Sequence, residues 1–370
     1  MSSVAEPLPP GALYPFGAGV PPLTIIDVRS PVEVARGALP GAHALPLMSD
    51  EERHQVGLRY AEAGQEAALA LGWELAGPHL PARVAAWRAA MQDRPAAVVC
   101  WRGGLRSALA CELIDRPQAR RVEGGYKAVR TALMASLPAA VARAPLLVLT
   151  GLTGSGKTAL LERLAGRSEQ LEVIDLEALA RHRGSSFGAV PEPQPPQPSF
   201  EHALLSRLRL HRARLVLVED ESRYIGRRTL PTPLLEAMRR APVALLEAPL
   251  PERVARVFEE YVRAPAAVAG VAATRAALEA ATLRLRKRLG GPRSRAVLGA
   301  LARAEAAWFE PDVHEPWIRL LLEGYYDRLY ERNRAALARR VALRGDADAL
   351  LEAFARERDG ARARPGQAPL

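Results

Sequence analysis

The residues from 96 to 107 combine a cysteine with glycine, arginine and serine in a pattern that suits an anionic sulfur. An apolar run, "AAVVC", ends on Cys100, and a helical pattern begins near Leu105. The candidate active-site residues after this cysteine are Arg102, Gly103, Gly104, Arg106 and Ser107. Glycines let backbone N–H groups face an anion at a helix N-terminus, and nearby arginines stabilise a thiolate. We therefore predict that Cys100 is catalytic, whereas Cys111 on the following helix is predicted to be a core residue.

A second stretch, "VLTGLTGSGKTALL", carries a phosphate-loop pattern of the Walker A type between an apolar strand and a helical run. The predicted diphosphate-binding residues are Gly151, Gly154, Ser155, Gly156, Lys157 and Thr158. The glycines expose N–H groups to a diphosphate, the lysine neutralises its outer oxygens, and the Thr158 hydroxyl is a ligand for Mg²⁺. Glu219 or Asp220, which end a later strand, are the other predicted ligands of this Mg²⁺ cofactor. ATP, GTP or an organic diphosphate would all fit the loop.

Charge and cysteine content limit the partner and the compartment. The 370 residues carry a formal net charge of +10, and 49% of them are hydrophobic. A globular chain with this charge favours a polyanionic partner, with nucleic acid first and an anionic membrane second. The two cysteines do not form a disulfide framework, and no apolar run reaches the length of a transmembrane helix. We therefore expect a cytoplasmic protein.

The order of apolar runs and helical patterns predicts an α/β fold. We expect a small parallel-sheet domain, followed by a P-loop NTPase-like α/β domain with a helical C-terminal part. The predicted boundaries are an extended lead-in at 1–22, a first domain at 23–137, a linker at 138–147, a P-loop domain at 148–250, a helical part at 251–357 and a disordered tail at 358–370. Residues 187–200 are rich in proline and are predicted to form an exposed loop.

Arginine-rich stretches supply candidate contacts to RNA. They are "RHRGSSFG", "EDESRYIGRRTLP" and "LRLRKRLGG", and the helical stretch "EPWIRLLLEGYYDRLY" adds tyrosines that could stack on an extruded base. The predicted RNA-binding residues are Arg183, Arg223, Arg227, Arg286, Lys287 and Tyr326. A solvated helix face is the alternative for each charged stretch. Trp317, Leu321 and Tyr325 are predicted to pack in a core, because they share one helical face.

The strings "IIDVRSPVEVARGALPGAHALP" and "VVCWRGGLRSALA" resemble the rhodanese family. The positions that match its first strand and following loop are Asp27, Arg29, Glu33, Gly37, Pro40, Gly41 and Ala42. His43 stands where the family commonly has asparagine. The resemblance implies that Cys100 carries sulfur or selenium. The spacing of Cys100 and Arg106 also matches rhodanese-like phosphatases, so this loop alone leaves both sulfur and phosphate chemistry open.

The order of the two parts resembles the family of bacterial tRNA 2-selenouridine synthases. The strings "LPLMSDEERHQVG", "EGGYKAVR", "SFEHALL", "VEDESRYIG" and "YYDRLY" carry this resemblance beyond generic rhodanese or P-loop membership. It implies exchange of sulfur for selenium at C2 of the wobble 2-thiouridine in lysine, glutamate and glutamine tRNAs. Geranyl diphosphate and selenophosphate are the implied substrates, with S-geranyl-2-thiouridine between the two steps. An enzyme that supplies selenophosphate is a further implied partner, and a membrane is not.

Two other functions are compatible with the same residues. The first is an ATP-dependent kinase fused to a rhodanese-like phosphatase, which predicts nucleotide hydrolysis and activity on phosphoesters. The second is an adaptor that carries sulfur and binds RNA without catalysis. In an adaptor, Cys100→Ser would block sulfur loading, and Lys157→Ala would leave tRNA chemistry untouched.

Overall fold

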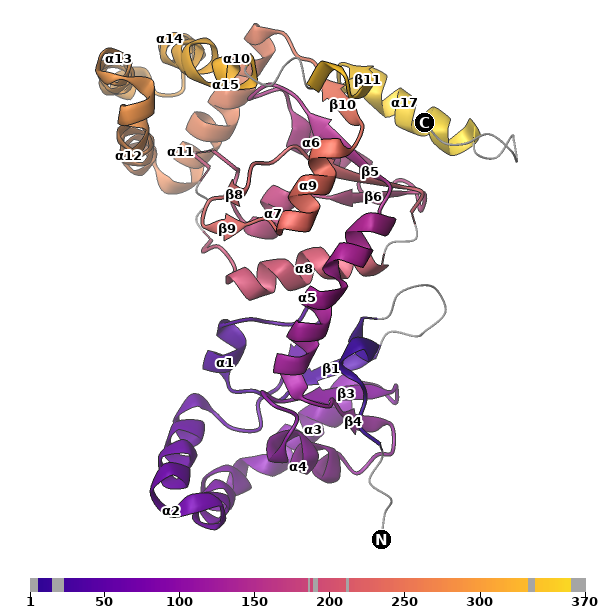
Figure 1. Cartoon of the computed structure of the whole chain (residues 1–370). Coiled ribbons are helices and arrows are strands. Elements are labelled where there is room, and N and C mark those ends of the chain that lie inside the picture. Colours follow the sequence, from indigo (N-terminus) through magenta and orange to yellow (C-terminus); the bar gives the residue numbers. More distant parts are fainter. Residues whose placement is uncertain are drawn as a thin grey trace. The chain divides into compact units, whose positions relative to one another are not determined.

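The computed structural model describes residues 6–14, 23–185, 187–188, 192–210, 213–331 and 337–360. Contacts divide the chain into two compact units (Figure 1). Unit 1 comprises Met1–Val141 and Pro195–His211, and unit 2 comprises Ala142–Gln194 and Arg212–Leu370. Each unit contains a parallel sheet with helices, so the predicted α/β class is confirmed. No helix in the described ranges is long and apolar enough to cross a membrane.

Unit 1 is built on a four-stranded parallel sheet of order β2-β1-β3-β4. The strands are β1 (Thr24–Asp27), β2 (Ala42–Ala44), β3 (Ala96–Val99) and β4 (Ala119–Arg121). Every residue of β1 and β3 is buried, as expected for central strands with helices on both faces. Because Asp27 pairs with Val99, the chain leaves these two strands at the same edge of the sheet.

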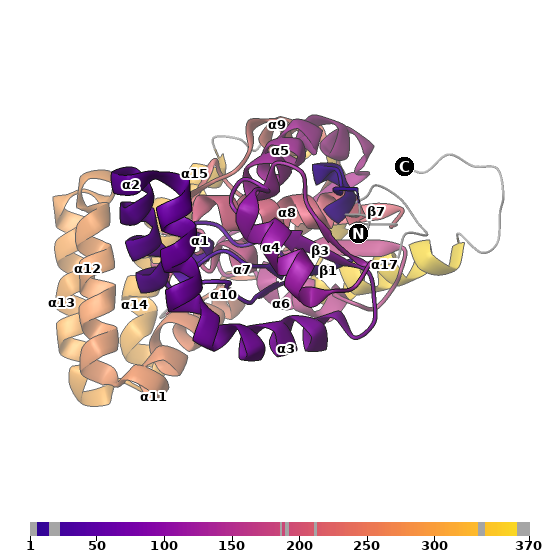
Figure 2. The ribbon, with the colours of Figure 1, turned by 90° about the horizontal axis from the view of Figure 1, so that it is seen from below.

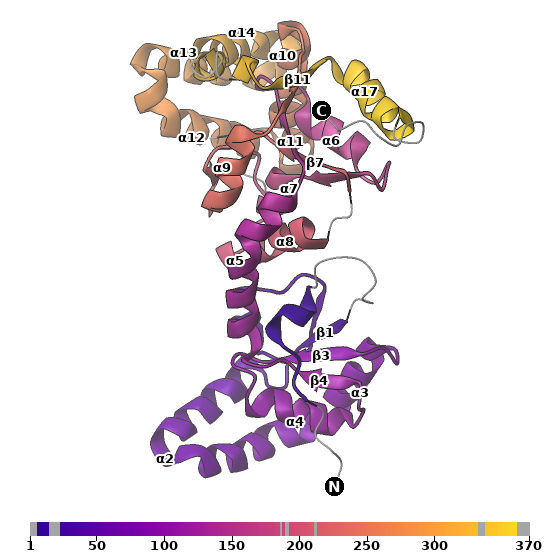
Figure 3. The same ribbon diagram turned by 45° about the vertical axis from the view of Figure 1, so that its right-hand side comes forward.

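The helices of unit 1 include a long helix that folds back on itself. They are η1 (Pro10–Leu13), α1 (Pro31–Ala35), α2 (Asp50–Ala76), η2 (Gly77–His79), α3 (Leu80–Met91), α4 (Leu105–Ile114), α5 (Gly125–Arg143) and α8 (Gln197–Leu210). In α2 the backbone leaves the helical conformation at Gly64, where φ is 81°, so the helix forms two arms (Figure 3). The core between sheet and helices includes Trp87 and Met91 of α3 and Ile114 of α4.

Unit 2 contains a five-stranded parallel sheet of order β11-β10-β5-β7-β6. The strands are β5 (Leu146–Thr150), β6 (Leu171–Ile174), β7 (Leu215–Glu219), β10 (Val243–Leu246) and β11 (Val341–Gly345), with a separate antiparallel pair of β8 (Tyr224–Ile225) and β9 (Arg228–Thr229). The central strand β5 is buried throughout. The glycine-rich stretch identified in the sequence follows β5 directly.

Helices surround this sheet and extend into a separate helical layer. They are α6 (Lys157–Leu164), α7 (Leu176–Ala180), α9 (Thr232–Arg240), α10 (Leu250–Phe258), η3 (Glu259–Arg263), α11 (Ala264–Ala269), α12 (Val271–Leu289), α13 (Gly291–Arg303), η4 (Ala304–Ala307), α14 (Pro311–Leu321), η5 (Leu322–Tyr326), α15 (Asp327–Glu331) and α17 (Ala347–Gly360). Figure 2 shows α12, α13 and α14 side by side. Trp317, Leu321 and Tyr325 are buried in the core of this layer, as predicted.

The predicted lead-in is not wholly extended. Leu8 forms a bridge with Val122 next to the sheet, and Leu13 and Tyr14 are buried. The Tyr14 hydroxyl also donates a hydrogen bond to the Pro40 carbonyl (2.8 Å). This segment packs on unit 1 because burial removes its apolar side chains from water. Residues 1–5 and 15–22 lie outside the described residues.

Two predicted loops are partly helical. Residues 138–147 were predicted as a linker, but α5 continues through Pro138 to Arg143, and β5 begins at Leu146. The predicted proline-rich loop ends early because α8 begins at Gln197 and buries Phe200.

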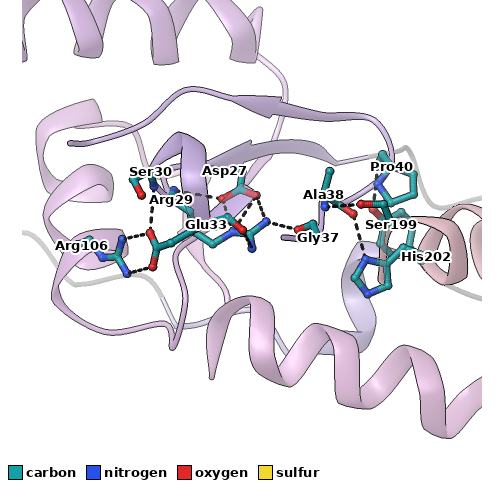
Figure 4. Close-up of polar contacts among 11 residues, drawn as sticks. Asp27, Arg29, Ser30, Glu33, Gly37, Ala38, Pro40, Arg106, Ser199 and His202 are labelled. Atoms are coloured by element: carbon teal, nitrogen blue, oxygen red, sulfur yellow. Dashed lines mark hydrogen bonds and ion pairs between the residues drawn. The ribbon is translucent and has the colours of Figure 1, made fainter. Parts of the chain in front are cut away.

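Helix α8 joins unit 1 although its sequence lies within the predicted P-loop domain. The Ala38 N–H donates to Ser199 Oγ (2.9 Å), and the His202 ring is 3.0 Å from the Ala38 carbonyl oxygen (Figure 4). Arg130 on α5 forms an ion pair with Glu201 (2.7 Å).

The C-terminal region also differs from the prediction. The segment 251–357 was predicted to be helical throughout, but β11 adds an edge strand to the sheet by pairing with β10. Helix α17 extends through Gly360, so residues 358–360 are helical rather than part of a disordered tail. The rest of the predicted tail, residues 361–370, lies outside the described residues.

Candidate active site

Cys100 lies directly after β3 and beside the start of α4. Its side chain is 3% exposed, and its thiol donates a hydrogen bond to Ser107 Oγ (3.2 Å). The Ser107 hydroxyl in turn donates to the Gly104 carbonyl (3.0 Å), so the first turn of α4 orients the hydroxyl next to the sulfur. A helix N-terminus carries partial positive charge, which stabilises an anion at this position. The arrangement suits a reactive sulfur or an anionic ligand held beside it.

The loop at residues 122–125 passes close to the cysteine loop (residues 100–107). Gly103 has φ 66°, and a Cβ there would lie 2.4 Å from the Val122 carbonyl oxygen. A Cβ at Gly125 would lie 2.3 Å from the Cys100 carbonyl oxygen. Only glycine fits such distances, so the two loops hold each other in place. Gly104 is different, because a Cβ there would meet no atom within 4 Å.

The two predicted arginines of the cysteine loop have different roles. The Arg106 guanidinium forms a two-pronged ion pair with Glu33, with N–O distances of 2.6 and 2.9 Å (Figure 4). Burial opposes the charge of both partners, but the pairing lowers the pKa of Glu33 and raises that of Arg106. Arg102 is exposed and has no ion pair within the described part of the chain. Arg106 therefore holds the loop in shape, and Arg102 is available to a ligand.

Asp27 and Arg29 form a buried ion pair at the same edge of the sheet, at 2.6 Å (Figure 4). Arg29 also donates to the carbonyl oxygens of Glu33 (3.3 Å) and Gly37 (2.8 Å). Its guanidinium carbon lies 3.8 Å from the centroid of the Tyr126 ring. This stacking role of Tyr126 was not predicted, because the tyrosine follows β4 and is remote from Arg29 in the sequence.

Removal of the Glu33 charge tests whether the ion pair between Arg106 and Glu33 stabilises unit 1. Glu33→Gln is expected to lower the stability of unit 1 by about 2 kcal/mol at neutral pH, because a charged hydrogen-bonded pair is lost. A carboxyl whose pKa is lowered by folding contributes stability above its unfolded pKa, and this contribution is lost as the pH falls through the folded value. The difference in Tm between wild type and variant should therefore be largest near neutral pH and shrink below the ordinary carboxyl value of 4.5.

Thermal denaturation of wild type and variant, at neutral pH and at a pH below 4.5, measures this difference in Tm. Glu62→Gln, a change at an exposed position of α2, is the matched control and should leave Tm unchanged at both. A Glu33→Gln effect of equal size at neutral and acidic pH would show that the ion pair is not its cause.

The glycine-rich loop of unit 2 (residues 151–158) connects β5 to α6, as the sequence predicts. Gly154 and Gly156 have φ 79° and 92°, a region that favours glycine. The Lys157 ammonium donates to the Gly151 carbonyl (3.1 Å) across the loop. Ser155 Oγ is buried and has no hydrogen-bond partner among the described residues. A phosphate oxygen in the loop would satisfy this hydroxyl, and the N-terminus of α6 would stabilise its charge.

Two arginines of α10 hold the same loop from outside, and sequence reasoning missed both. Arg253 is 3% exposed, donates to the Thr153 carbonyl (2.8 Å) and pairs with Asp327 (2.6 Å). Arg256 donates to the Ser155 carbonyl (3.0 Å). The i, i+3 spacing of these residues was the available signal, but nothing in the sequence links it to a loop a hundred residues earlier.

Three glutamates meet beside the glycine-rich loop. The Glu177 N–H donates to Glu219 Oε2 (3.2 Å), and the Glu177 and Glu221 side chains are hydrogen-bonded. Burial and mutual repulsion raise the pKa values of Glu177 and Glu219 to about 8 and that of Glu221 to about 7. The same carboxylates and Tyr330 raise the pKa of Lys157 although burial opposes it. The loop thus keeps a charged lysine beside acids that can exchange protons near neutral pH.

The predicted Mg²⁺ ligands have suitable chemistry, because hydroxyl and carboxylate oxygens are the groups Mg²⁺ prefers. Thr158 lies in the first turn of α6, Glu219 is the last residue of β7, and Asp220 follows it directly. Asp220 accepts a hydrogen bond from the Thr150 hydroxyl (2.6 Å). Across the residues that the structure describes, no three or more His, Cys, Asp or Glu side chains are arranged to hold a metal ion. A Mg²⁺ ion here would take most of its ligands from phosphate and water, as is usual for this ion.

Two of the predicted RNA-binding residues contact neighbouring backbone or side chains of unit 2. Arg183 donates to the Glu260 carbonyl (2.9 Å), and its guanidinium carbon lies 5.3 Å from the centroid of the Tyr261 ring. Tyr326 packs against the helical core, hydrogen-bonds to Ser185, and has its pKa raised by burial. Tyr326 therefore has a structural role, whereas Arg183 is exposed and lies at the surface, like the residues described next.

The other predicted RNA-binding residues lie at the surface. Arg223, Arg227, Arg286 and Lys287 are all exposed. Arg223 lies beside Tyr224, whose side chain is 58% exposed, with the guanidinium carbon 5.9 Å from the ring centroid. This exposed aromatic residue next to an arginine is a stacking candidate that the sequence analysis did not select.

Comparisons with known proteins identify similar chains. A family model described as "tRNA 2-selenouridine synthase AAA domain" matches residues 144–360. The tRNA 2-selenouridine synthase of Cupriavidus necator is 43% identical, over 89% of this chain and 93% of that protein. The protein of the same name from Hahella chejuensis is 41% identical, over 92% of each.

A solved structure, the N-terminal domain of an ATP/GTP-binding protein from Clostridium difficile, is also similar to part of the chain. It is 25% identical over 30% of this chain and 89% of its own, with a TM-score of 0.29, which is too low to carry an argument. The family model and the curated relatives do carry one, because together they cover most of the sequence. The chain therefore belongs to the enzyme family of tRNA 2-selenouridine synthases.

Proposed function

We propose that the chain is a tRNA-modifying transferase that replaces the C2 sulfur of wobble 2-thiouridine with selenium in two steps. The first step alkylates the sulfur with geranyl diphosphate, and the second displaces geranylthiol with selenium from selenophosphate. Lysine, glutamate and glutamine tRNAs are the expected acceptors. Family membership supports the overall exchange, and two loops suited to anions, one in each unit, support its division into two steps.

In the first step, the thiocarbonyl sulfur attacks C1 of geranyl diphosphate while the C1–O bond breaks. The electron pair leaves with diphosphate, and the uridine loses its N3 proton. Lys157 and the N-terminus of α6 would stabilise the charge that develops on the departing diphosphate. Mg²⁺ bound at Thr158 with Glu219 or Asp220 would supply further positive charge to the same oxygens. Alkylation matters because a thiocarbonyl sulfur is a poor leaving group, and a thioether sulfur leaves readily as a thiol.

In the second step, selenium forms a bond to C2 and the C2–S bond breaks. The sulfur takes the electron pair and a proton and leaves as geranylthiol. Water cleaves the P–Se bond, so that phosphate is released and N3 regains its proton. Cys100, Ser107 and the N-terminus of α4 would bind the selenium donor, and the exposed Arg102 would pair with its phosphate.

The observation that carries the proposal is the glycine-rich loop with its charged Lys157, within the segment that matches the family model. Purified protein incubated with thiolated tRNA, geranyl diphosphate, selenophosphate and Mg²⁺ should yield 2-selenouridine, measured by mass spectrometry of digested nucleosides. Without selenophosphate the reaction should stop at S-geranyl-2-thiouridine. Hydrolysis of ATP with unchanged nucleosides would instead support a kinase.

A further inference from the structure

An open apolar cavity of about 630 Å³ lies in unit 1, within the usual size range of small-molecule sites. It is bordered by both arms of α2, by α4 and by Leu47, Met48 and Leu80. The arms of α2 fold back at Gly64 (Figure 3), so residues on either side of this break face one space. No step described above uses this cavity.

The cavity concentrates apolar side chains that folding leaves in contact with water. Its lining includes Leu58, Tyr60, Leu69, Trp73 and Leu105, which are 50%, 59%, 39%, 49% and 56% exposed. Scattered apolar residues on a surface need no explanation, but a contiguous group of this kind usually marks a binding site. A ligand with an apolar body would remove these side chains from water.

The cavity also reaches the cysteine loop. Leu105 and Arg106, in the first turn of α4, line it, and the next residue, Ser107, accepts the hydrogen bond of the Cys100 thiol. An apolar group in the cavity would therefore end close to the sulfur of Cys100.

We infer that this cavity holds the geranyl chain of S-geranyl-2-thiouridine during the selenium step, an inference that rests on the proposed function. In that step the C2–Se bond forms and the C2–S bond breaks, and the sulfur leaves with its electron pair and a proton as geranylthiol. A chain anchored between α2 and α4 places its sulfur beside the cysteine loop. The nucleoside C2 is then presented to the selenium donor bound at Cys100.

Two arginines lie at the rim of the cavity. Arg53 and Arg106 border it and are 40% and 24% exposed at the side chain, and both pair with Glu33, at 3.5 and 2.6 Å. Their polar ends give the apolar cavity a charged edge, which suits a ligand whose apolar chain is attached to a polar nucleoside. The cavity is open rather than enclosed, so geranylthiol can leave after the exchange.

The test uses preformed substrates, which separates the selenium step from geranylation. Two RNA oligonucleotides carry either S-geranyl-2-thiouridine or S-methyl-2-thiouridine, and each is incubated with selenophosphate. Each buried methylene contributes roughly fourfold in affinity, so wild type should prefer the geranyl substrate in kcat/KM by at least about 100-fold. The double variant Leu58→Gln/Leu69→Gln should reduce this preference at least about tenfold, mainly through KM, and leave the rate with the methyl substrate unchanged.

Val32→Gln is the matched control, because Val32 is an exposed apolar residue of unit 1 that does not line the cavity. It should keep the full geranyl preference. An unchanged preference in the double variant would overturn the assignment, and a change in oligomeric state with unchanged preference would identify the cavity as a self-association surface. If wild type converts neither oligonucleotide, the proposed function itself fails, and this inference fails with it.

Discussion

Lys157→Ala is expected to abolish geranylation of thiolated tRNA, with kcat/KM for geranyl diphosphate at least about 100-fold below wild type. The leaving diphosphate gains charge as the C1–O bond breaks, and Lys157 is the cation built into the glycine-rich loop. Its pKa is raised by Tyr330, Glu219 and Glu177, so the ammonium is charged at any physiological pH. Mass spectrometry of tRNA nucleosides after incubation with geranyl diphosphate alone measures the loss.

Loss of this lysine should not unfold the loop. The neighbouring glutamates already have raised pKa values and can take up protons when the ammonium is removed. The variant should therefore still convert preformed S-geranyl RNA to the selenium product at the wild-type rate. Lys127→Ala, an exposed position on α5, is the matched control and should geranylate normally. Normal geranylation by Lys157→Ala would exclude the glycine-rich loop as the diphosphate site.

Ligand-induced stabilisation gives a second measurement of the same site. A ligand that binds only the folded protein raises Tm, and the stabilisation grows with the logarithm of one plus its concentration over Kd. Geranyl diphosphate should raise the Tm of wild type and not that of Lys157→Ala. If ATP produced this shift and geranyl diphosphate did not, the loop would be a nucleotide site.

Both loops could be predicted from the sequence because each is encoded locally. A buried strand, closely spaced glycines and the start of a helix lie within a dozen residues in each case, and backbone geometry then determines where Cys100 and Lys157 lie. The structure adds what holds these loops in place. Gly103 packs closely against Gly125 of the loop at residues 122–125. The Ser155 carbonyl accepts a hydrogen bond from Arg256.

The supports of the loops could not be predicted because they come from distant segments. Arg253 contacts Thr153 from a helix that belongs to another part of unit 2, and its pairing partner Asp327 is more distant still. The sequence of helix α8 lies within the predicted P-loop domain, but Ser199 and His202 hydrogen-bond to Ala38, between α1 and β2 of unit 1. Local patterns report which face of an element is apolar, not which partner covers it.

The edge strand β11 was also not predicted, because its pairing partner is distant in the sequence. Its residues alternate between half-buried and exposed, and it is preceded and followed by helical sequence. A short strand at the edge of a sheet is specified by its pairing with β10 as much as by its composition. The prediction of continuous helix over 251–357 was wrong at this point for that reason.

Cys100→Ser is expected to spare geranylation and to stop selenium incorporation. Unit 2, which contains the glycine-rich loop, does not contain Cys100. Conversion to S-geranyl-2-thiouridine should therefore proceed at the wild-type rate. The selenium product should fall at least about 100-fold, because a serine hydroxyl is a much weaker nucleophile than a cysteine thiol. Nucleoside mass spectrometry with both substrates present should show the S-geranyl form accumulating.

The substitution is also a conservative change in shape. Serine at residue 100 can keep the hydrogen bond to Ser107 Oγ, so the loop geometry and Tm should change little. Cys111→Ser is the matched control, because this thiol packs against the same core and burial raises its pKa to about 12. A thiol with that pKa stays protonated, so its loss should leave both steps intact. Equal loss of geranylation and selenation in Cys100→Ser would contradict the assignment of one step to each unit.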